Sequence, residues 1–367
     1  QALSIFGDHT DVMACRSTGF SFLCSSSVQE AEDMAAIAHL SAIKSSMPFL
    51  HFFDGFRTSH EIQKIELLDI EDMKKMVSEK GIKEFRDRAL TPEAPVTRGT
   101  NQNPDVYFQA REVQNKYYDA IPDIVARYMG EMGELTGRHY LPFDYYGDKE
   151  AENVIVAMGS VCDTIKETID YLAETKGEKL GLIQVRLYRP FSEKYFKRAL
   201  NQCKNVKKIA VLDRVKDNAA LNEPLCEDIK SYFVNKENIP YIIGGRYGLS
   251  SKDTTPAQII AVYDNLAKKE PKDGFTIGIV DDVTFKSLNV KKEISLAKKG
   301  TYELKFFGLG SDGTVGANKN TIKIIGDHTP KYCQAYFDYD SKKSGGYTCS
   351  HLRFGDSPIN APYLVTT

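Results

Sequence analysis

The sequence lacks several features that would define its function class at once. It contains no run of about 18 apolar residues, so no membrane-spanning helix is expected. Its formal net charge is −2 at pH 7, so no overall charge attracts nucleic acid or an anionic membrane. Closely spaced cysteines are also missing: the nearest pair among the seven is Cys15 and Cys24, which excludes a C-x-x-C pair or a cluster-binding run in this chain. We therefore expect free, buried thiols in a reducing compartment, and neither a nucleic acid nor a membrane as partner.

Both ends of the chain are unusual. It opens with QALSIFGD, without a methionine, and stops at PYLVTT, and both segments have strand-like sequences. Because a domain that begins or ends within a strand leaves sheet hydrogen bonds unmade, we expect this chain to be a piece of a longer protein.

The beginning of the chain has the pattern of an α/β fold. Residues 28–46 carry apolar residues at helical spacing, and Ser27 is placed to cap that helix. Residues 48–56 indicate a buried strand that ends at the turn formed by Asp54 and Gly55.

The next segment is expected to be less regular. A second helix is predicted at about 61–78, and the many turn-forming residues of 86–122 indicate a long irregular loop. A helix near 122–136 then leads to a domain boundary close to residue 148.

The middle of the chain alternates regularly between strand and helix patterns. The helices between the strands are about ten to fifteen residues long, an alternation typical of a parallel, doubly wound sheet. The expected strands are 153–160, 179–191, 207–214, 240–248 and 275–282.

A Lys- and Ser-rich stretch, 284–302, indicates a linker to a third α/β unit. Strand 302–307, helix 314–326 and strand 332–338 would form one β–α–β unit, which the remaining residues are too few to extend into a complete domain.

The loop in this unit, GLGSDGTVGANK at 308–319, has glycines at G-x-G-x-x-G spacing. A strand before it, a helix after it and an acidic residue at the end of the next strand (Asp338 or Asp340) are typical of dinucleotide binding. Asp312, however, introduces a carboxylate into the turn where a pyrophosphate would bind. From the residues alone, a nicotinamide cofactor, another phosphate-bearing ligand and a tight turn without a ligand all stay open.

Three other groups of polar residues are candidates for a function. Asp8, His9 and Asp11 could ligate a metal, but a capped loop is favoured because no fourth ligand is near them in sequence. Residues 57–60 (Arg57, Thr58, Ser59 and His60) follow a predicted strand, where α/β active sites commonly lie, or they simply begin a helix. For Arg186 and Arg189, an ion pair between domains is the favoured interpretation.

Long blocks of the sequence resemble the pyruvate:ferredoxin (flavodoxin) oxidoreductases, also called pyruvate synthases, over essentially all 367 residues. The blocks occur in the same order as in that family and are far more specific than the glycine spacing. They are LSIFGDHTDVMACRSTGF, VQEAEDMAAIAHLSAIKSSMPFLHFFDGFRTSHEIQKIE, VRLYRPF, AVLDR, GRYGLSSK, GLGSDGTVGANKNTIKIIGD and YDSKKSGGYTCSHLRFGDSPI.

The resemblance implies a large homodimer that contains thiamine diphosphate, magnesium and 4Fe-4S clusters. Such an enzyme decarboxylates pyruvate oxidatively, transfers the acetyl unit to coenzyme A and reduces ferredoxin or flavodoxin, in the cytoplasm or a reducing organelle of an anaerobe. It also implies three domains: 1–148 as the later part of a pyrimidine-type thiamine-fold domain, 149–290 as a domain similar to the C-terminal domain of transketolase, and 291–367 as a linker and the start of a domain associated with coenzyme A.

In the resembling family, the residues that bind pyruvate and activate thiamine precede the region that matches Gln1, and the diphosphate–magnesium site and cluster cysteines follow the region that matches Thr367. We therefore expect no catalytic residue and no metal ligand in this chain, no tightly bound cofactor, and no activity of the chain alone. The resemblance places Leu3 and Ile5 close to the thiazolium of thiamine.

The glycine loop would then bind coenzyme A, because a helix N-terminus and nearby lysines suit its phosphates. The candidate residues are Gly310, Ser311, Gly313, Thr314, Asn318, Lys319, Lys342 and Lys343. In the alternative, Thr314 caps the helix and Lys342 and Lys343 face solvent.

Two alternatives to this function stay open from the sequence. One is a relative that acts on another 2-oxo acid, or that passes its electrons to NADP through a fused flavin reductase. The other is a non-catalytic nucleotide-binding module that has kept these folds.

Overall fold

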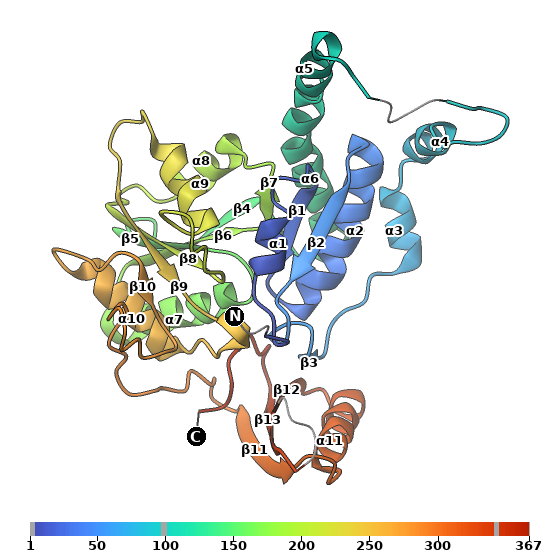
Figure 1. The fold of residues 1–367 in the computed structure, drawn as a ribbon. Helices are drawn as coiled ribbons and strands as arrows, with labels where there is room; N and C mark the ends of the chain where they lie inside the picture. Colours follow the sequence, from blue (N-terminus) through green and yellow to red (C-terminus); the bar gives the residue numbers. More distant parts are fainter. Residues whose placement is uncertain (1–3, 97–100, 341–344, 367) are drawn as a thin grey trace.

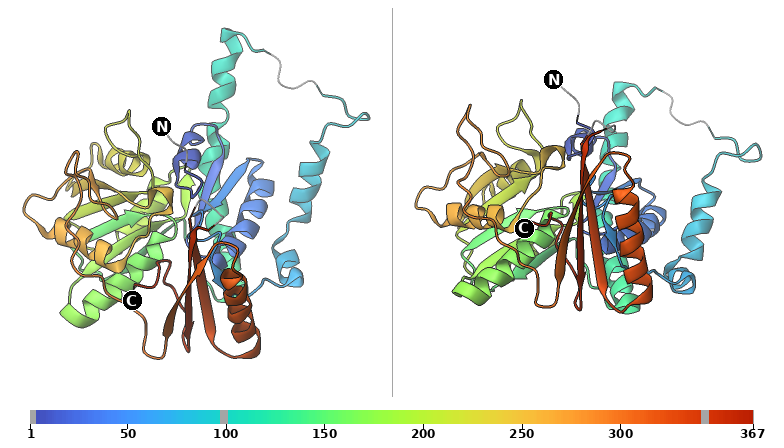
Figure 2. Two further views of the ribbon diagram at one scale, coloured as in Figure 1. Left: turned by 60° about the horizontal axis from the view of Figure 1, so that its bottom comes forward. Right: turned by 90° about the horizontal axis from the view of Figure 1, so that it is seen from below.

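The structure is a computed structural model that describes residues 4–96, 101–340 and 345–366. These residues form three β-sheets, and most strands of each come from one stretch of the chain: blue for the first, green to orange for the second and red for the third in Figure 1. The third, red sheet borders both of the others in each view of Figure 2. The mixed α/β fold predicted from the sequence is therefore confirmed.

The first sheet has the strand order β2–β1–β7. Strands β1 and β2 are parallel, and β7 runs antiparallel to β1 at its other edge. The strands are β1 (Ser21–Ser25), β2 (Phe49–Phe53) and β7 (Leu187–Arg189), and the helices of this part of the chain are α1 (Thr10–Ala14), α2 (Val28–Ser45), α3 (Ile70–Met76), α4 (Glu79–Asp87), α5 (Pro104–Glu112) and α6 (Asn115–Thr136).

The second sheet has the order β10–β9–β8–β5–β6–β4, in which only the edge strand β4 is antiparallel. Its helices cover both faces, α7 and α10 on one and α8 and α9 on the other (Figure 1). The strands are β4 (Phe143–Gly147), β5 (Asn153–Ala157), β6 (Leu180–Val185), β8 (Lys208–Asp213), β9 (Tyr241–Arg246) and β10 (Phe275–Thr276), and the helices are α7 (Val161–Lys176), α8 (Glu193–Leu200), α9 (Pro224–Phe233) and α10 (Pro256–Ala267), with a 3₁₀ turn at Leu249–Ser251.

The third sheet has the order β11–β13–β12–β3, and all its neighbours are antiparallel. Its elements are β11 (Tyr302–Leu309), α11 (Thr314–His328), β12 (Tyr332–Tyr339), β13 (Tyr347–Gly355) and β3 (Ile62–Gln63). The predicted β–α–β order of β11, α11 and β12 is present, but β13 lies between the two parallel strands, so the unit is a split one.

Local sequence patterns predicted several elements correctly. The Ser27 hydroxyl caps α2 by accepting a hydrogen bond from the Glu30 amide at 3.1 Å. The strand–helix alternation predicted for the middle of the chain forms the second sheet, although β10 is shorter than predicted.

Two predictions for the segment after β2 were wrong. The helix expected at about 61–78 is replaced by β3 and the shorter helix α3, because β3 pairs with a strand far along the chain that no local pattern indicates. The loop expected at 86–122 contains α5 and the start of α6. Asn103 and Pro104, which suggested a turn, stand instead at the cap and first position of α5.

The single strand expected at 179–191 is two strands that belong to different sheets, β6 and β7, and Arg186 lies between them. Its guanidinium is buried and donates to Glu30 on α2 at 2.7 Å and to Asp144 on β4. The predicted ion pair between domains is thus confirmed for Arg186. Arg189 pairs with Asp228 on α9 at 2.9 Å.

The cores of the first and second sheets are continuous. One cluster joins Phe22 and Phe52 of the first sheet to Val154, Val211 and other apolar side chains of the second. All seven cysteines lie within the described residues and are free, and six of them are buried. In the same part of the chain, no helix has the length and apolarity that a membrane crossing requires.

The third sheet is attached to the rest of the chain through buried polar groups. Glu61, next to β3, accepts hydrogen bonds from Gln334 and from the Tyr336 hydroxyl on β12, both at 2.8 Å. Burial raises the pKa of Glu61 to about 7, although these two hydrogen bonds lower it. Arg57 extends the junction by pairing with Asp253 at 3.0 Å.

We predict that Glu61 makes this junction pH-dependent. Because its pKa is raised in the folded state, the folded protein holds a proton that the unfolded chain releases. The resulting stability is fully present below about pH 4.5 and is lost as the pH rises through about 7. Glu61→Gln should remove this loss, so its free energy of unfolding relative to wild type should rise by about 2–3 kcal/mol between pH 5 and pH 8.

The measurement is denaturant unfolding of both proteins at the two pH values, with the exposed Glu270→Gln as matched control. An equal pH dependence for wild type and Glu61→Gln would contradict the prediction.

Candidate functional site

A cavity of about 500 Å³ lies where the start of the chain, the turn after β2 and the third sheet meet. The start of the chain contributes Ile5 and Phe6, and the turn contributes Phe56 and His60. The third sheet contributes Gly310, Ser311, Val315, Tyr339, Asp340, Gly346, Tyr347 and Thr348. The structure thus brings Ile5, predicted to lie near thiamine, into one cavity with Gly310 and Ser311, predicted to lie near coenzyme A.

The carboxylate of Asp54 fixes the turn that borders this cavity. Asp54 directly follows β2 and is fully buried. It accepts hydrogen bonds from His9 Nε2 at 2.6 Å, from the Ser160 hydroxyl at 2.6 Å and from the Ser160 amide at 2.9 Å. A side chain on Gly159 would meet this carboxylate at 2.8 Å, so the close approach requires a glycine there.

A buried arginine balances the charge of Asp54. Arg214 Nη1 lies 3.4 Å from Asp54 Oδ1, and both side chains are almost completely inaccessible to solvent. Burial alone would raise the pKa of Asp54, but Arg214 and the hydrogen bonds from His9 and Ser160 outweigh it and hold the pKa well below its usual value. Asp54 is therefore a carboxylate at neutral pH.

The contacts of His9 and Asp8 favour a capped loop at Asp8, His9 and Asp11 over a metal site. His9 is committed to Asp54, and Asp8 Oδ1 accepts from the Thr10 amide at 2.9 Å, as a capped loop requires. Within residues 4–96, 101–340 and 345–366, no group of three or more His, Cys, Asp or Glu side chains is arranged to hold a metal ion.

Beyond Asp54, the turn presents an aromatic platform to the cavity. The rings of Phe56 and His60 stack with centroids 4.0 Å apart and an interplanar angle of 4°, and Phe6 contacts Phe56 edge-on at 4.9 Å. Ser59 supports the platform, because its hydroxyl accepts from the Phe56 amide at 2.9 Å and lies 2.8 Å from His60 Nδ1.

The glycine loop forms the opposite wall, and its own carboxylate organises it. Asp312 accepts hydrogen bonds from the Leu309 amide at 2.8 Å, the Thr314 amide at 2.8 Å and the Thr314 hydroxyl at 2.9 Å. These bonds hold the pKa of Asp312 below its usual value. Gly308 is required because a Cβ there would meet Thr314 Oγ1 at 2.7 Å, and Gly313 is at a φ of 90°.

This arrangement leaves few loop amides for a phosphate. The Thr314 amide is bound to Asp312, the Asp312 amide donates to the Leu309 carbonyl, and the Gly310 amide donates to the Gly346 carbonyl at 2.6 Å. The amides of Leu309, Gly310, Asp312 and Thr314 are thus already bound, unlike those in the open cradle of a dinucleotide-binding turn. Asp312 accepts from the first amide of α11, whose N-cap residue is Gly313, so Thr314 does not cap the helix.

None of the remaining predicted residues within the described chain lines the cavity. Asn318 is buried on α11, and Lys319 Nζ lies 5.3 Å from the ring centroid of Phe337, close enough to His60 to influence its charge. Leu3, Lys342 and Lys343 lie outside the described residues. The sequence singled out His60 by its place after a strand, whereas Phe56, Tyr339 and Tyr347 were missed because only the folded chain brings their segments together.

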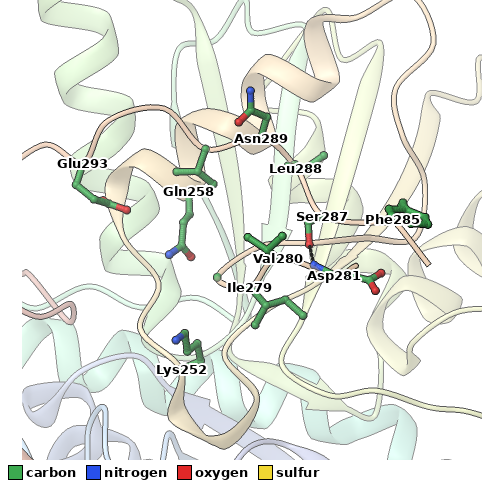
Figure 3. A pocket seen from close by; sticks show the side chains of 12 residues that line it. Lys252, Gln258, Ile279, Val280, Asp281, Phe285, Ser287, Leu288, Asn289 and Glu293 are labelled. Carbon is green, nitrogen blue, oxygen red and sulfur yellow. Dashed lines mark hydrogen bonds between the residues drawn. The ribbon is translucent and has the colours of Figure 1, made fainter. Parts of the chain in front are cut away.

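A second cavity, of about 770 Å³, lies beside the second sheet, between the 278–293 segment and α10 (Figure 3). Lys252, Gln258 and Glu293 surround it, and the Asp281 amide donates to the Ser287 hydroxyl at 2.8 Å on its other side. None of the site residues predicted from the sequence lines this cavity, so the smaller cavity is the stronger candidate site.

Comparison with known proteins identifies the family. Residues 1–130 match the model described as "Pyruvate flavodoxin/ferredoxin oxidoreductase, thiamine diP-bdg", 151–259 match "Pyruvate:ferredoxin oxidoreductase core domain II", and 303–367 match "Pyruvate ferredoxin/flavodoxin oxidoreductase". The chain is 59% identical over 364 residues to pyruvate:ferredoxin oxidoreductase of Moorella thermoacetica and 57% identical over 365 residues to pyruvate-flavodoxin oxidoreductase of Enterobacter agglomerans. Each alignment covers 99% of this chain and 31% of the relative.

The chain belongs to the pyruvate:ferredoxin/flavodoxin oxidoreductase family.

It spans about a third of the length of these curated relatives. Within the oxidoreductase family the chain is also 50% identical to the pyruvate dehydrogenase [NADP(+)] of Cryptosporidium parvum, of which it covers 19%. The thiamine-binding family match contains Ile5, Asp54 and His60, and the 303–367 match contains the glycine loop. The cavity therefore lies between two separately matched segments of the oxidoreductase.

We predict that the chain depends on Asp54 for its stability. Asp54→Asn leaves the buried guanidinium of Arg214 without a countercharge, which should lower the free energy of unfolding by about 3–5 kcal/mol. Asp217→Asn, which removes the partner of Arg16 in a partly exposed pair at 3.9 Å, should change it by less than about 1 kcal/mol.

Chemical unfolding of wild type and the two variants at neutral pH measures both effects. The prediction fails if Asp54→Asn is no less stable than Asp217→Asn.

Proposed function

We propose that this chain is the part of a pyruvate:ferredoxin (flavodoxin) oxidoreductase in which coenzyme A reaches the thiamine-binding domain. The whole enzyme would convert pyruvate and coenzyme A to acetyl-coenzyme A, carbon dioxide, two electrons and one proton, and the electrons would reduce ferredoxin or flavodoxin. The observation that carries the proposal is the cavity shared by Ile5 and Phe6, from the thiamine-binding match, and the loop at Gly310 and Ser311.

The cavity fits the arm of coenzyme A better than its phosphates. Its volume of about 500 Å³ lies in the range of small-molecule sites, and its walls combine aromatic rings with a few hydroxyls. The glycine-loop amides, by contrast, are largely bound within the loop. We therefore place the thiol-bearing arm in the cavity and the phosphates near Lys319 at its rim, where Lys342 and Lys343 are further candidates.

The other cofactors would be held mainly outside this chain. We propose that thiamine diphosphate, its magnesium ion and the 4Fe-4S clusters of the homodimeric enzyme are bound by residues that this chain does not include, with Leu3 and Ile5 as an apolar wall beside the thiazolium. When bound, thiamine diphosphate would supply the carbon nucleophile that decarboxylation of a 2-oxo acid requires. The chain alone is expected to be inactive.

We propose the domain limits inferred from the sequence, 1–148, 149–290 and 291–367. One observation bears on the first boundary. Strand β4, which precedes residue 148, pairs with β6 in the second sheet. The pairing supports a boundary at the end of α6, a few residues earlier.

The full-length enzyme that contains this chain tests the function. With coenzyme A and ferredoxin or flavodoxin present, its kcat/KM for pyruvate should be at least about tenfold higher than its kcat/KM for 2-oxoglutarate, because a site built for one substrate rejects larger analogues.

A matched pair of variants tests the place of coenzyme A. Tyr347→Ala, in the cavity wall, should raise the KM for coenzyme A about tenfold and leave that for pyruvate unchanged. Tyr302→Ala, on the exposed part of β11, should change neither constant.

Steady-state kinetics with each substrate varied in turn gives these values. No turnover of pyruvate, or faster turnover of 2-oxoglutarate, would contradict the proposed reaction. Equal KM values for coenzyme A in the two variants would contradict the proposed place of its arm.

A further inference from the structure

His60 is the one imidazole in the lining of the 500 Å³ cavity, as far as the described residues show. Its ring is held on two sides, by the parallel stack on Phe56 and by the contact of Nδ1 with the Ser59 hydroxyl at 2.8 Å. When Nδ1–H donates to that hydroxyl, the lone pair of the imidazole is on Nε2. A ring fixed in this way is oriented before any ligand arrives, which is what a proton acceptor requires.

The charges around His60 favour the neutral ring. Partial loss of contact with water lowers the pKa of His60, although the residue stays exposed, and Lys319 on α11 lowers it further. The other titratable groups in the cavity wall are Asp340 and Tyr339 at the end of β12 and Tyr347 on β13. A neutral imidazole at pH 7 has a free lone pair and takes up a proton readily.

The proposed reaction requires such a group. Coenzyme A enters as a thiol, with an ordinary pKa of about 8.5, but the nucleophile that forms a thioester is the thiolate. A proton must therefore leave sulfur as it bonds to the acyl carbon. In the proposed geometry the thiol-bearing arm lies between the glycine loop and the Phe56–His60 platform, within reach of the ring.

We propose that His60 is a catalytic residue whose Nε2 accepts the thiol proton of coenzyme A during acetyl transfer. This inference rests on the proposed function and, in contrast to the expectation from the sequence that the chain contains no catalytic residue, assigns one step to His60. The S–H bond breaks and a C–S bond forms to the acyl carbon that pyruvate leaves after losing carbon dioxide, and the bond from that carbon to the carbon nucleophile that carried it breaks. The proton passes to His60 and then to solvent, and the two electrons of the oxidation pass to ferredoxin or flavodoxin.

The test uses the full-length enzyme with His60→Phe, which keeps a flat ring on Phe56 and removes both nitrogens. The control is His328→Phe at the exposed end of α11, which does not line the cavity. At pH 7, His60→Phe should lower the rate of acetyl-coenzyme A formation at saturating coenzyme A at least about 100-fold. The KM for coenzyme A should rise by no more than about tenfold, the share of one lost hydrogen bond, and the rate deficit should shrink as the pH rises toward 9, where the thiol ionises without help.

A binding measurement gives a readout that does not depend on turnover. By calorimetry, wild type should bind coenzyme A about threefold to tenfold more tightly than desulfo-coenzyme A, which lacks the thiol, because a hydrogen bond from sulfur to Nε2 is present only with the former. His60→Phe should bind the two ligands equally, and His328→Phe should behave as wild type does.

The outcomes separate this inference from the proposed function. If wild type releases carbon dioxide from pyruvate but His60→Phe matches His328→Phe, the role of His60 is wrong and the function stands. A rate deficit that is the same at every pH, with the preference for coenzyme A over its desulfo analogue retained, also overturns the role, because it indicates a structural effect. If wild type releases no carbon dioxide from pyruvate, the proposed function fails and the inference fails with it.

Discussion

The buried carboxylate of Asp54 is the interaction on which the cavity depends. A charge without water is costly unless donors surround it, and the donors to Asp54 come from three distant segments: His9 before α1, Ser160 after β5 and Arg214 after β8. Satisfying one carboxylate therefore fixes the start of the chain, the turn after β2 and the second sheet relative to one another. That arrangement also positions the aromatic platform of Phe56 and His60, because both residues belong to the turn after β2.

Exchange of strands reinforces this junction. The segment after β6 contributes β7 to the edge of the first sheet, and the first part of the chain contributes β3 to the edge of the third. Separating either pair would break backbone hydrogen bonds and expose the ion pair of Arg186 with Glu30 or the buried side chain of Glu61. A cavity between parts joined in this way has fixed walls, and fixed walls orient two reactants at little entropic cost.

Features set by residues close together in the sequence were predicted, whereas features set by contacts between distant segments were not. The cap of α2 at Ser27 and the alternation of the second sheet are local, and both were predicted. Strands β3 and β7 were not, because their partners lie far away in the chain. The glycine spacing indicated a tight turn, but only the structure shows that Asp312 occupies its amides. His60 was singled out by its place after a strand, yet its neighbours in the cavity come from β12, β13 and the glycine loop, more than 240 residues later.

A structure of the full-length enzyme with coenzyme A bound tests the account most directly. We expect electron density for the thiol-bearing arm between the Phe56–His60 platform and the wall formed by Ser311 and Tyr347, with the sulfur facing His60. Density for the arm outside this cavity, with the cavity filled by solvent or by another part of the protein, would contradict it.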